Sequence, residues 1–401
     1  MLWPAWSWSD RAFVACAVVA VVVAYRAGSL TDSRTAWAVL LAASLAMHAR
    51  LAVGAVHAVV LALLAAAALG AATARLAPAL TAGGTALAAA WLIGRYRRRT
   101  RVLRVGVGVG AVALTLAALS AAPSSPLEAR LRGAALVGLA GFASSLLRLA
   151  LEPLFDGVFG HATRLTLSEW LDLDHPLLRE LATVAPGTLQ HSVNVGLLAG
   201  AAANALGADA LLARVGGLYH DVGKAAAPEY FVENQAGRNP HDDLDPRESA
   251  RILRRHVTDG VERVLAHGLG ERIAAFVREH HGTGVMRLLE ARAGAAAADD
   301  PEAFRYPGPR PRSIETGLLM IADQVEATAR AAQPADLAAC ARVVRQTVSR
   351  IRGEGELDDC PLSDRQLARA EQALAKALHA MYHRRLAYPP ARLGPPAAAR
   401  V

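Results

Sequence analysis

Apolar residues dominate the first part of the chain and recur in runs that are long enough to cross a membrane. These runs lie at about 11–28, 35–49, 51–73, 77–95, 103–122 and 133–155. A spanning helix needs about 20 mainly apolar residues, so four of the runs are comfortably long. The run at 35–49 is short, and only Arg50 separates it from the next one. We therefore expect six spans, with five as the alternative.

The second part of the chain has a different pattern. After a linker that leads into an amphipathic helix at 156–182, apolar residues recur at helical spacing, with no alternating strand signal. The pattern predicts helices at 187–206, 211–220, 249–267, 271–281, 314–332, 335–351 and 364–384. A tail rich in Pro and Ala follows and is predicted to be disordered. The fold class is therefore all-α: a multi-span helical membrane bundle (1–155), an all-helical soluble domain (156–386) and a tail (387–401).

The charge pattern predicts that the soluble domain lies in the cytoplasm. The net charge is +8, but many arginines flank the spans, where they set topology, so the basic total does not indicate a nucleic-acid polymer as partner. The most basic short loop, at 94–101, is expected inside, and six spans then put both the N-terminus and the soluble domain inside. Three cysteines without metal or disulfide spacing fit a reducing compartment. We expect a multi-pass protein of the plasma (inner) membrane, with the lipid bilayer as a partner.

The predicted spans contain few residues that could bind or transport a ligand. We identify no intramembrane Asp, Glu or Lys of the kind that marks a transport path, and His48 and His57 are expected to face the bundle interior. The membrane half is thus interpreted as a scaffold that positions the soluble domain.

Candidate chemistry centres on the adjacent pair His220 and Asp221. An imidazole suits transition metals and a carboxylate suits harder cations, so the pair could bind one metal and bridge to a second. An isolated pair is more often an ordinary surface feature. Here, however, further candidate ligands lie at the ends or inner faces of predicted helices: His191, His256, His280, His281 and Asp323. Asp323 follows a strongly apolar stretch, and burying it requires a counter-charge, either a metal or an arginine. Helical bundles build dinuclear sites from such inward-pointing side chains.

The order His…His-Asp…His…His-His…Asp resembles that of the HD-domain metal phosphohydrolases. The surrounding phrases are more specific and resemble the membrane-anchored seven-helix HD phosphodiesterases of the PgpH type, which degrade cyclic di-AMP. They are Ala185-Pro186-Gly187-Thr188, Leu212-Ala213-Arg214-Val215-Gly216, Glu233-Asn234-Gln235, Asn239-Pro240-His241-Asp242, His256-Val257, His280-His281-Gly282-Thr283 and Phe304-Arg305-Tyr306-Pro307-Gly308-Pro309. Two features depart from this family: its usual His-Asp-Ile-Gly reads His-Asp-Val-Gly here, and the usual large extracytoplasmic domain has no room before the spans.

The resemblance implies a site with two divalent transition-metal ions, and the ligand types favour Mn or Fe. One ion is expected on His191, His220, Asp221 and Asp323. Asp221 bridges to a second ion on His256 and His280, with His281 as a further ligand or a phosphate contact. The catalytic group is expected to be His220, Asp221, Lys224 and His281. The substrate contacts are expected to be Lys224, His281, Arg305 and Tyr306.

The implied substrate is cyclic di-AMP, hydrolysed to pApA, and the protein could form a homo-oligomer. Two alternatives stay open: the same enzyme acting on another cyclic dinucleotide or nucleotide, and a catalytically weak membrane receptor for cyclic nucleotides. The absence of a Gly-Tyr-Pro motif after Gly282 argues against the cyclic di-GMP branch. The complete series of candidate ligands argues against the receptor.

Overall fold

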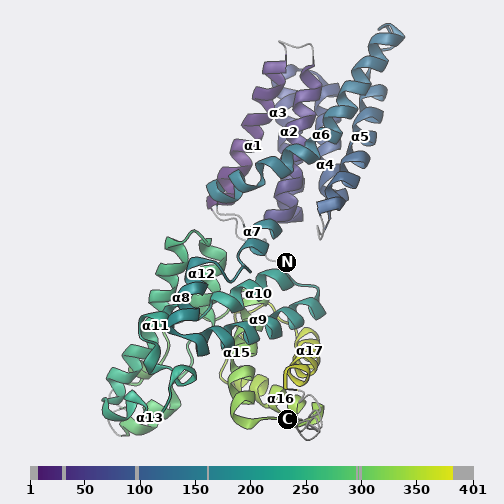
Figure 1. The fold of residues 1–401 in the computed structure, drawn as a ribbon. Coiled ribbons are helices and arrows are strands. Elements are labelled where there is room, and N and C mark those ends of the chain that lie inside the picture. Colours follow the sequence, from purple (N-terminus) through teal and green to yellow (C-terminus); the bar gives the residue numbers. More distant parts are fainter. Residues whose placement is uncertain are drawn as a thin grey trace, which may run out of the picture. The chain divides into compact units, whose positions relative to one another are not determined.

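The computed structural model describes residues 8–28, 33–94, 99–159, 162–294, 297 and 300–382, except for the side chains of 99–101. The regular structure in these ranges is helical, and Val285 and Arg305 form an isolated β-bridge. The predicted all-α class is confirmed. The chain divides into two compact units, Met1–Asp172 with Gly268–Arg272, and Leu173–His267 with Ile273–Val401 (Figure 1). The predicted tail and residues 95–98 of the basic loop lie outside the described residues.

The first unit contains the apolar helices, which run alongside one another as a bundle (Figure 1). Six of the described helices are long and apolar enough to span a membrane, which matches the six predicted spans. They are α1 (Trp8–Ala27), α2 (Arg34–Ala52), α3 (Ala55–Thr73), α4 (Leu76–Ile93), α5 (Arg99–Ser120) and α6 (Leu127–Phe159). The short run at 35–49 is the centre of α2, which extends at both ends to 19 residues.

Small residues let α5 and α6 approach closely. A methyl group added at Gly110 would lie 2.9 Å from the carbonyl oxygen of Gly138, and one at Gly141 would lie 2.8 Å from Cβ of Ala113. Membrane helices associate through such small-residue contacts, because lipid tails offer no hydrophobic gain for association. The Ala- and Gly-rich composition of the spans therefore serves their packing.

Two acids in α6 correct the expectation that the spans hold none. Glu152 is buried and forms an ion pair of 2.7 Å with the buried Arg148, one helical turn earlier. Asp156 is also buried and accepts hydrogen bonds from the hydroxyls of Thr163 and Thr166. The i,i+4 spacing puts Arg148 and Glu152 on one face, so the two charges compensate each other. His48 and His57 are buried in this unit, as predicted.

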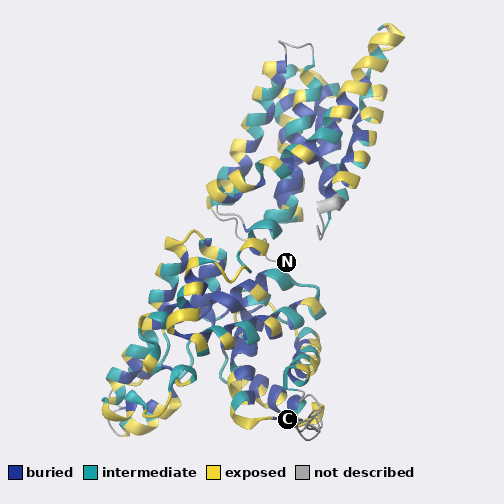
Figure 2. Cartoon of the chain, in the orientation of Figure 1, coloured by how far each residue is buried: buried dark blue, intermediate teal, exposed yellow. Residues whose placement is uncertain are grey.

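The helices of the remaining chain begin and end within three residues of the predicted bounds. They are α9 (Pro186–Leu206), α10 (Ala210–Tyr219), α11 (Pro246–Ala266), α12 (Gly270–Glu279), α15 (Ile314–Ala332), α16 (Leu337–Gly353) and α17 (Asp364–Tyr382). Eight shorter elements were not predicted separately from the sequence pattern. They are α7 (Arg164–Glu169), α8 (Pro176–Val184), α13 (Arg287–Ala293) and the 3-10 turns η2 (Val222–Ala226), η3 (Pro228–Tyr230), η4 (Val232–Asn234), η5 (Pro240–Asp243) and η6 (Pro301–Phe304). Figure 2 shows buried residues concentrated where α9, α10 and α15 meet.

Side-chain caps fix where the central helices begin. Asp209 accepts a hydrogen bond from the backbone N–H of Leu212 and caps α10. Ser313 and Thr316 form a capping box at the start of α15. Such caps satisfy backbone N–H groups that have no partner within the helix. By fixing the starts of α10 and α15, the caps also set which residues of each helix point into the core.

Close backbone contacts at glycines bring four of these elements together in two pairs. A methyl group on Gly217 of α10 would lie 2.4 Å from Cα of Gly196 on α9. One on Gly223 of η2 would lie 1.9 Å from the carbonyl oxygen of His256 on α11. Real Cβ atoms do not approach so closely, so a larger residue at either position would separate the elements. The glycines thus place α9, η2 and α11 around the end of α10, where His220 and Asp221 lie.

Candidate metal centre

The carboxylate of Asp221 lies at the centre of four imidazoles. Its Oδ2 is 3.2 Å from Nε2 of His220 and 3.7 Å from Nε2 of His191. Its Oδ1 is 3.5 Å from Nε2 of both His256 and His280. One oxygen therefore faces α9 and α10, and the other faces α11 and the end of α12. A carboxylate in this position can bridge two cations.

Asp323 completes the first of these two sides. Its Oδ1 is 3.0 Å from Nε2 of His191 and 3.8 Å from Nε2 of His220. Asp323 projects from the buried middle of α15, ten residues after the Ser313 cap. Among the described residues the partner of this acid is His191 and not an arginine, which was one of the two predicted counter-charges. The other, a metal ion, could be held by His191 and Asp323 together.

The opposite nitrogen of each imidazole is held by the protein. Nδ1 of His220 contacts the carbonyl oxygen of Gly217 at 2.8 Å, and Nδ1 of His280 contacts that of Val277 at 2.7 Å. Nδ1 of His256 contacts the carbonyl oxygen of Leu253. A carbonyl only accepts, so these three Nδ1 atoms carry the proton. Each Nε2 lone pair is then directed towards Asp221, as in metal-binding histidines.

This donor arrangement fits metal ions. Nε2 of His256 and Nε2 of His280 lie 3.3 Å apart, although neither carries a proton when Nδ1 does. Two lone pairs at this distance repel each other unless a cation lies near both. Nε2 of His220 and Oδ1 of Asp221 are buried and have no hydrogen-bond partner of good geometry among the described residues. Such groups cost free energy unless they are satisfied. Within the described ranges, two three-residue groups could hold an ion: His191 with His220 and Asp221, and His256 with His280 and His281.

The two sides differ electrostatically. Burial alone would lower the pKa of His191, but hydrogen bonds to Asp323 and Glu326 raise it to about 9. Burial lowers the pKa of His256 to about 3 and that of His281 well below its usual range. Burial opposes ionisation of Asp221, yet the neighbouring His220 and Lys224 side chains hold its pKa well below the usual range. The first side is therefore rich in charge, whereas the second presents neutral imidazoles ready to act as ligands.

The turn after α12 carries His281 and is fixed from two directions. The ring of Tyr306 stacks on His281, with centroids 4.0 Å apart. Glu356 is buried and accepts hydrogen bonds from the backbone N–H of Thr283 at 2.9 Å and from its hydroxyl at 2.6 Å. Gly282, between these residues, has φ +53, and a Cβ there would lie 2.1 Å from Oε2 of Glu356. The turn therefore requires a glycine and a carboxylate that lies 73 residues further along the chain than Thr283.

Lys224 lies beside the centre and is largely shielded from solvent. Its ammonium group is 2.7 Å from Oδ2 of Asp221 and 2.8 Å from Oε1 of Glu233, and it lies 4.9 Å from the ring centroid of Phe231. With 11% of its side chain exposed, Lys224 is not a solvated residue at a helix end. Burial disfavours its charge, but the two carboxylates raise the pKa of Lys224. A permanent positive charge thus lies at the edge of the centre, and its predicted contact with a phosphate stays a prediction.

Arg305, another of the four predicted substrate contacts, is partly exposed. It donates a hydrogen bond from Nη1 to the carbonyl oxygen of Thr283, at 3.1 Å. It therefore holds the same turn as Glu356. Tyr306 contacts the centre by stacking on His281. Nε2 of His241 lies 3.0 Å from the carbonyl oxygen of Tyr230. The substrate roles of Arg305 and Tyr306 stay predictions.

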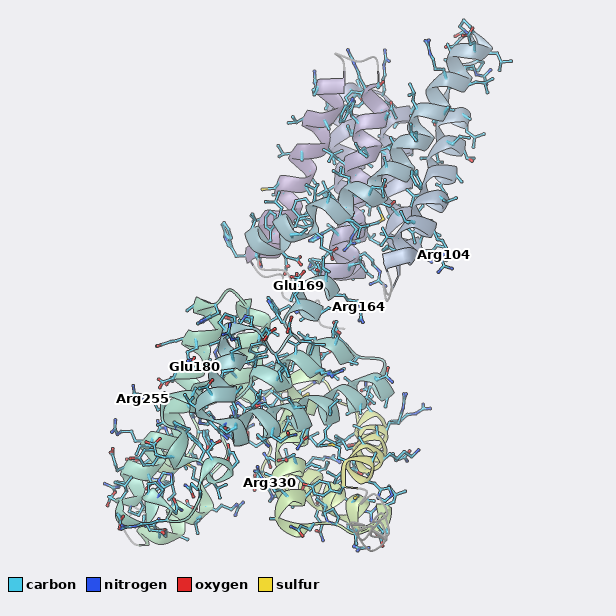
Figure 3. All side chains as sticks on the ribbon, in the orientation of Figure 1. Arg104, Arg164, Glu169, Glu180, Arg255 and Arg330 are labelled. Carbon is cyan, nitrogen blue, oxygen red and sulfur yellow. The ribbon has the colours of Figure 1, made fainter. Side chains whose placement is uncertain are left out.

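Three carboxylates that support the centre were not predicted from the sequence. Oε2 of Glu326 is 2.6 Å from Nδ1 of His191, Glu356 holds the His281 turn, and Glu233 pairs with Lys224. Arg330, labelled in Figure 3, lies 3.8 Å from Glu326. The spacing of Asp323 and Glu326 at i,i+3 gave a usable signal for one of them, because it places both on one face of α15. Glu356 gave none, because its partner lies 73 residues away.

Comparison with known proteins agrees with this geometry. The model of the HD domain family matches residues 188–328. A crystal structure of the HD domain of the Listeria monocytogenes phosphodiesterase PgpH is 34% identical, with a TM-score of 0.50, and the match covers 52% of this chain and all of that one. The chain belongs to the PgpH-type HD-domain family.

Two curated PgpH proteins extend the match towards the membrane unit. Cyclic-di-AMP phosphodiesterase PgpH of Bacillus subtilis is 35% identical over 314 residues, which is 77% of this chain and 44% of the relative. The protein of the same name from Listeria monocytogenes is 33% identical over 315 residues, again 77% of this chain and 44% of the relative. The chain thus spans less than half the length of these PgpH relatives.

Proposed function

We propose that this protein is a membrane-anchored, metal-dependent phosphodiesterase that hydrolyses cyclic di-AMP to pApA. The observation that carries the proposal is the position of Asp221, with one oxygen facing His191 and His220 and the other facing His256 and His280. The activity named for the two PgpH relatives supports the choice of substrate.

The residues present would hold two divalent ions, one on each side of Asp221, and we propose Mn or Fe from the nitrogen and oxygen donors. When bound, such ions polarise a phosphodiester and lower the pKa of a water molecule. Asp323 and His191 complete the first side, and His281 borders the second. These assignments of ligands extend the predictions from sequence and rest on the distances given above.

The protein's own side chains set the geometry of the site, offset the charge of a phosphate and limit the access of water. Asp221 fixes the spacing of the two sides because all four Nε2 atoms face its oxygens. Lys224 provides a positive charge beside Oδ2 of Asp221, where it would offset the charge of a phosphate. Tyr306 covers His281 and limits the access of water to that ring. Hydrolysis adds water across one phosphodiester bond, and a 3′-oxygen leaves with a proton.

We also propose that the HD domain lies in the cytoplasm of a plasma-membrane protein, and that the first 155 residues act as the anchor. The basic loop between α4 and α5 supports this orientation. A cysteine introduced at the exposed Ser124, in a variant without native cysteines, should react with a membrane-impermeant maleimide in spheroplasts. Protection of Ser124→Cys until the cells are lysed would reverse the orientation.

The full chain, purified in detergent with Mn²⁺, tests the activity against a panel of cyclic di-AMP, cyclic di-GMP and mononucleotides. We expect pApA from cyclic di-AMP, complete loss in Asp221→Asn, and retention in the control Asp242→Asn, a nearby exposed carboxylate. Cleavage of another nucleotide, with cyclic di-AMP left intact, would refute the substrate. Binding of the panel without any turnover would favour the receptor instead.

A further inference from the structure

A polar cavity of about 550 Å³ opens at one end of the membrane bundle. It lies where α2, α4 and α6 begin and α1 and α5 end, and all of its described lining belongs to the first unit. Its volume falls within the range of small-molecule sites, about 300–1,000 Å³. It is distinct in sequence and in structural unit from the metal centre.

Three arginines line this cavity: Arg34, Arg75 and Arg130. The described lining includes no Asp or Glu, and none of the three guanidinium groups forms an ion pair or a side-chain hydrogen bond with a described residue. Nε of Arg130 is buried without a partner. Asp32, the nearest acid in sequence to Arg34, lies outside the described residues. A buried guanidinium donor without an acceptor is costly, so an anion is the expected complement.

The position of these arginines relative to the membrane also indicates a ligand. In the orientation proposed above, this end of the bundle faces outward, together with the loop between α5 and α6. Arginines are depleted from short outward loops because they oppose correct insertion. The three arginines of this cavity therefore oppose the charge bias that sets the orientation of the spans. This indicates that they are present to bind a ligand.

Hydroxyl groups and small apolar residues form the remaining walls. Tyr25, Thr81 and Ser120 contribute hydroxyls, and Thr81 lies 3.4 Å from Ser120. Pro78 and Val137 contribute apolar surface. Guanidinium groups bind phosphate in bidentate fashion, and several of them match a tetrahedral anion better than one planar carboxylate. The volume exceeds that of a phosphate group, so there is room for a polyol body that the hydroxyls can bind.

We propose that this cavity binds a phosphate ester with a small polyol body, through Arg34, Arg75 and Arg130. The same chemistry occurs in an anionic phospholipid headgroup and in a free phosphate ester. The proposal does not depend on the substrate of the HD domain.

The full chain in lipid nanodiscs distinguishes the two sources by its thermal unfolding midpoint. One arm compares phosphatidylglycerol with phosphatidylcholine nanodiscs, and the other adds sn-glycerol 3-phosphate to phosphatidylcholine nanodiscs. We expect the midpoint to rise in at least one arm and to increase with ligand concentration, as it does when a ligand binds only the folded state. A rise in the first arm alone identifies a lipid headgroup, and a rise in the second identifies a soluble ester.

Matched variants connect the effect to the cavity. Arg130→Gln should weaken the apparent affinity at least about tenfold, the usual effect of losing a hydrogen bond to a charged group. Arg75→Gln, at the exposed rim, provides a second test if Arg130→Gln does not fold. Arg132→Gln is the control, because Arg132 lies on the same helix, is exposed and does not line the cavity. No shift in either arm, or an equal loss in Arg132→Gln, would overturn the proposal.

Discussion

Replacing Glu326 with Gln should weaken one side of the metal centre selectively. The carboxylate of Glu326 lies 2.6 Å from Nδ1 of His191, and both side chains are 3% exposed. Glu326 therefore fixes the orientation of the His191 ring and makes Nε2 of His191 a stronger electron-pair donor to a metal ion. Gln keeps the size and an accepting oxygen but removes the charge. Neither Arg330, at 3.8 Å, nor Asn194, at 3.4 Å, would replace it, because both contact Glu326 rather than His191.

The loss of such a supporting partner typically reduces metal affinity by about 10- to 100-fold. Because the accepting oxygen is kept, we expect the lower end, about tenfold or about 1.4 kcal/mol. Calorimetric titration of the metal-free full chain with Mn²⁺ measures this directly. One of two binding steps should weaken, and the other should change little.

The control is Glu262→Gln, the same substitution on the exposed face of α11. Two unchanged binding steps in Glu326→Gln would show that Glu326 does not act through a metal ligand. Equal weakening of both steps, together with a lower unfolding temperature, would indicate a general effect on stability instead.

Three further perturbations test other parts of the site. Glu356→Gln should weaken the other metal-binding step, since one amide oxygen cannot replace both carboxylate contacts to Thr283; an effect confined to the step altered by Glu326→Gln would contradict this reasoning. Lys224→Ala should raise the KM for cyclic di-AMP about tenfold or more while metal content is retained, and an unchanged KM would remove Lys224 from phosphate binding. Gly223→Ala should lower the free energy of unfolding by about 1–3 kcal/mol and reduce metal content, because its Cβ would lie 1.9 Å from the carbonyl oxygen of His256. Unfolding followed by circular dichroism measures the stability, and elemental analysis measures the metal. Wild-type values for both would refute the close contact.

The sequence predicted the helices well because their signals are local. Apolar periodicity acts within one or two turns. The caps Asp209 and Ser313 and the helix-starting Pro246 are local signals as well, but the prediction did not use them, and it placed the start of α11 three residues too late. The candidate ligands were also recognisable, since the His-Asp pair is accompanied by further histidines at or near the ends of predicted helices and by an acid in an apolar stretch. The short 3-10 turns were not found, because each is defined by one or two hydrogen bonds without a repeating pattern.

The residues that support the candidate ligands could be identified only from the tertiary structure. Glu356 and Thr283 lie far apart in sequence, and the contact of Gly223 with His256 depends on how η2 crosses α11. The burial of Lys224 follows from Glu233 and Phe231, which fold back over it from η4 and the residue before it. The pair of Arg148 and Glu152 could have been recognised from its i,i+4 spacing, but the length of the apolar run around it obscured the signal.

The central claim is that Asp221 bridges two cations held by histidines of four different segments. Anomalous diffraction from crystals of the protein grown with Mn²⁺ tests this most directly. Two peaks about 3.5–4 Å apart are predicted, one beside His191 and His220 and the other beside His256 and His280. A single peak, or peaks away from Asp221, would contradict the account.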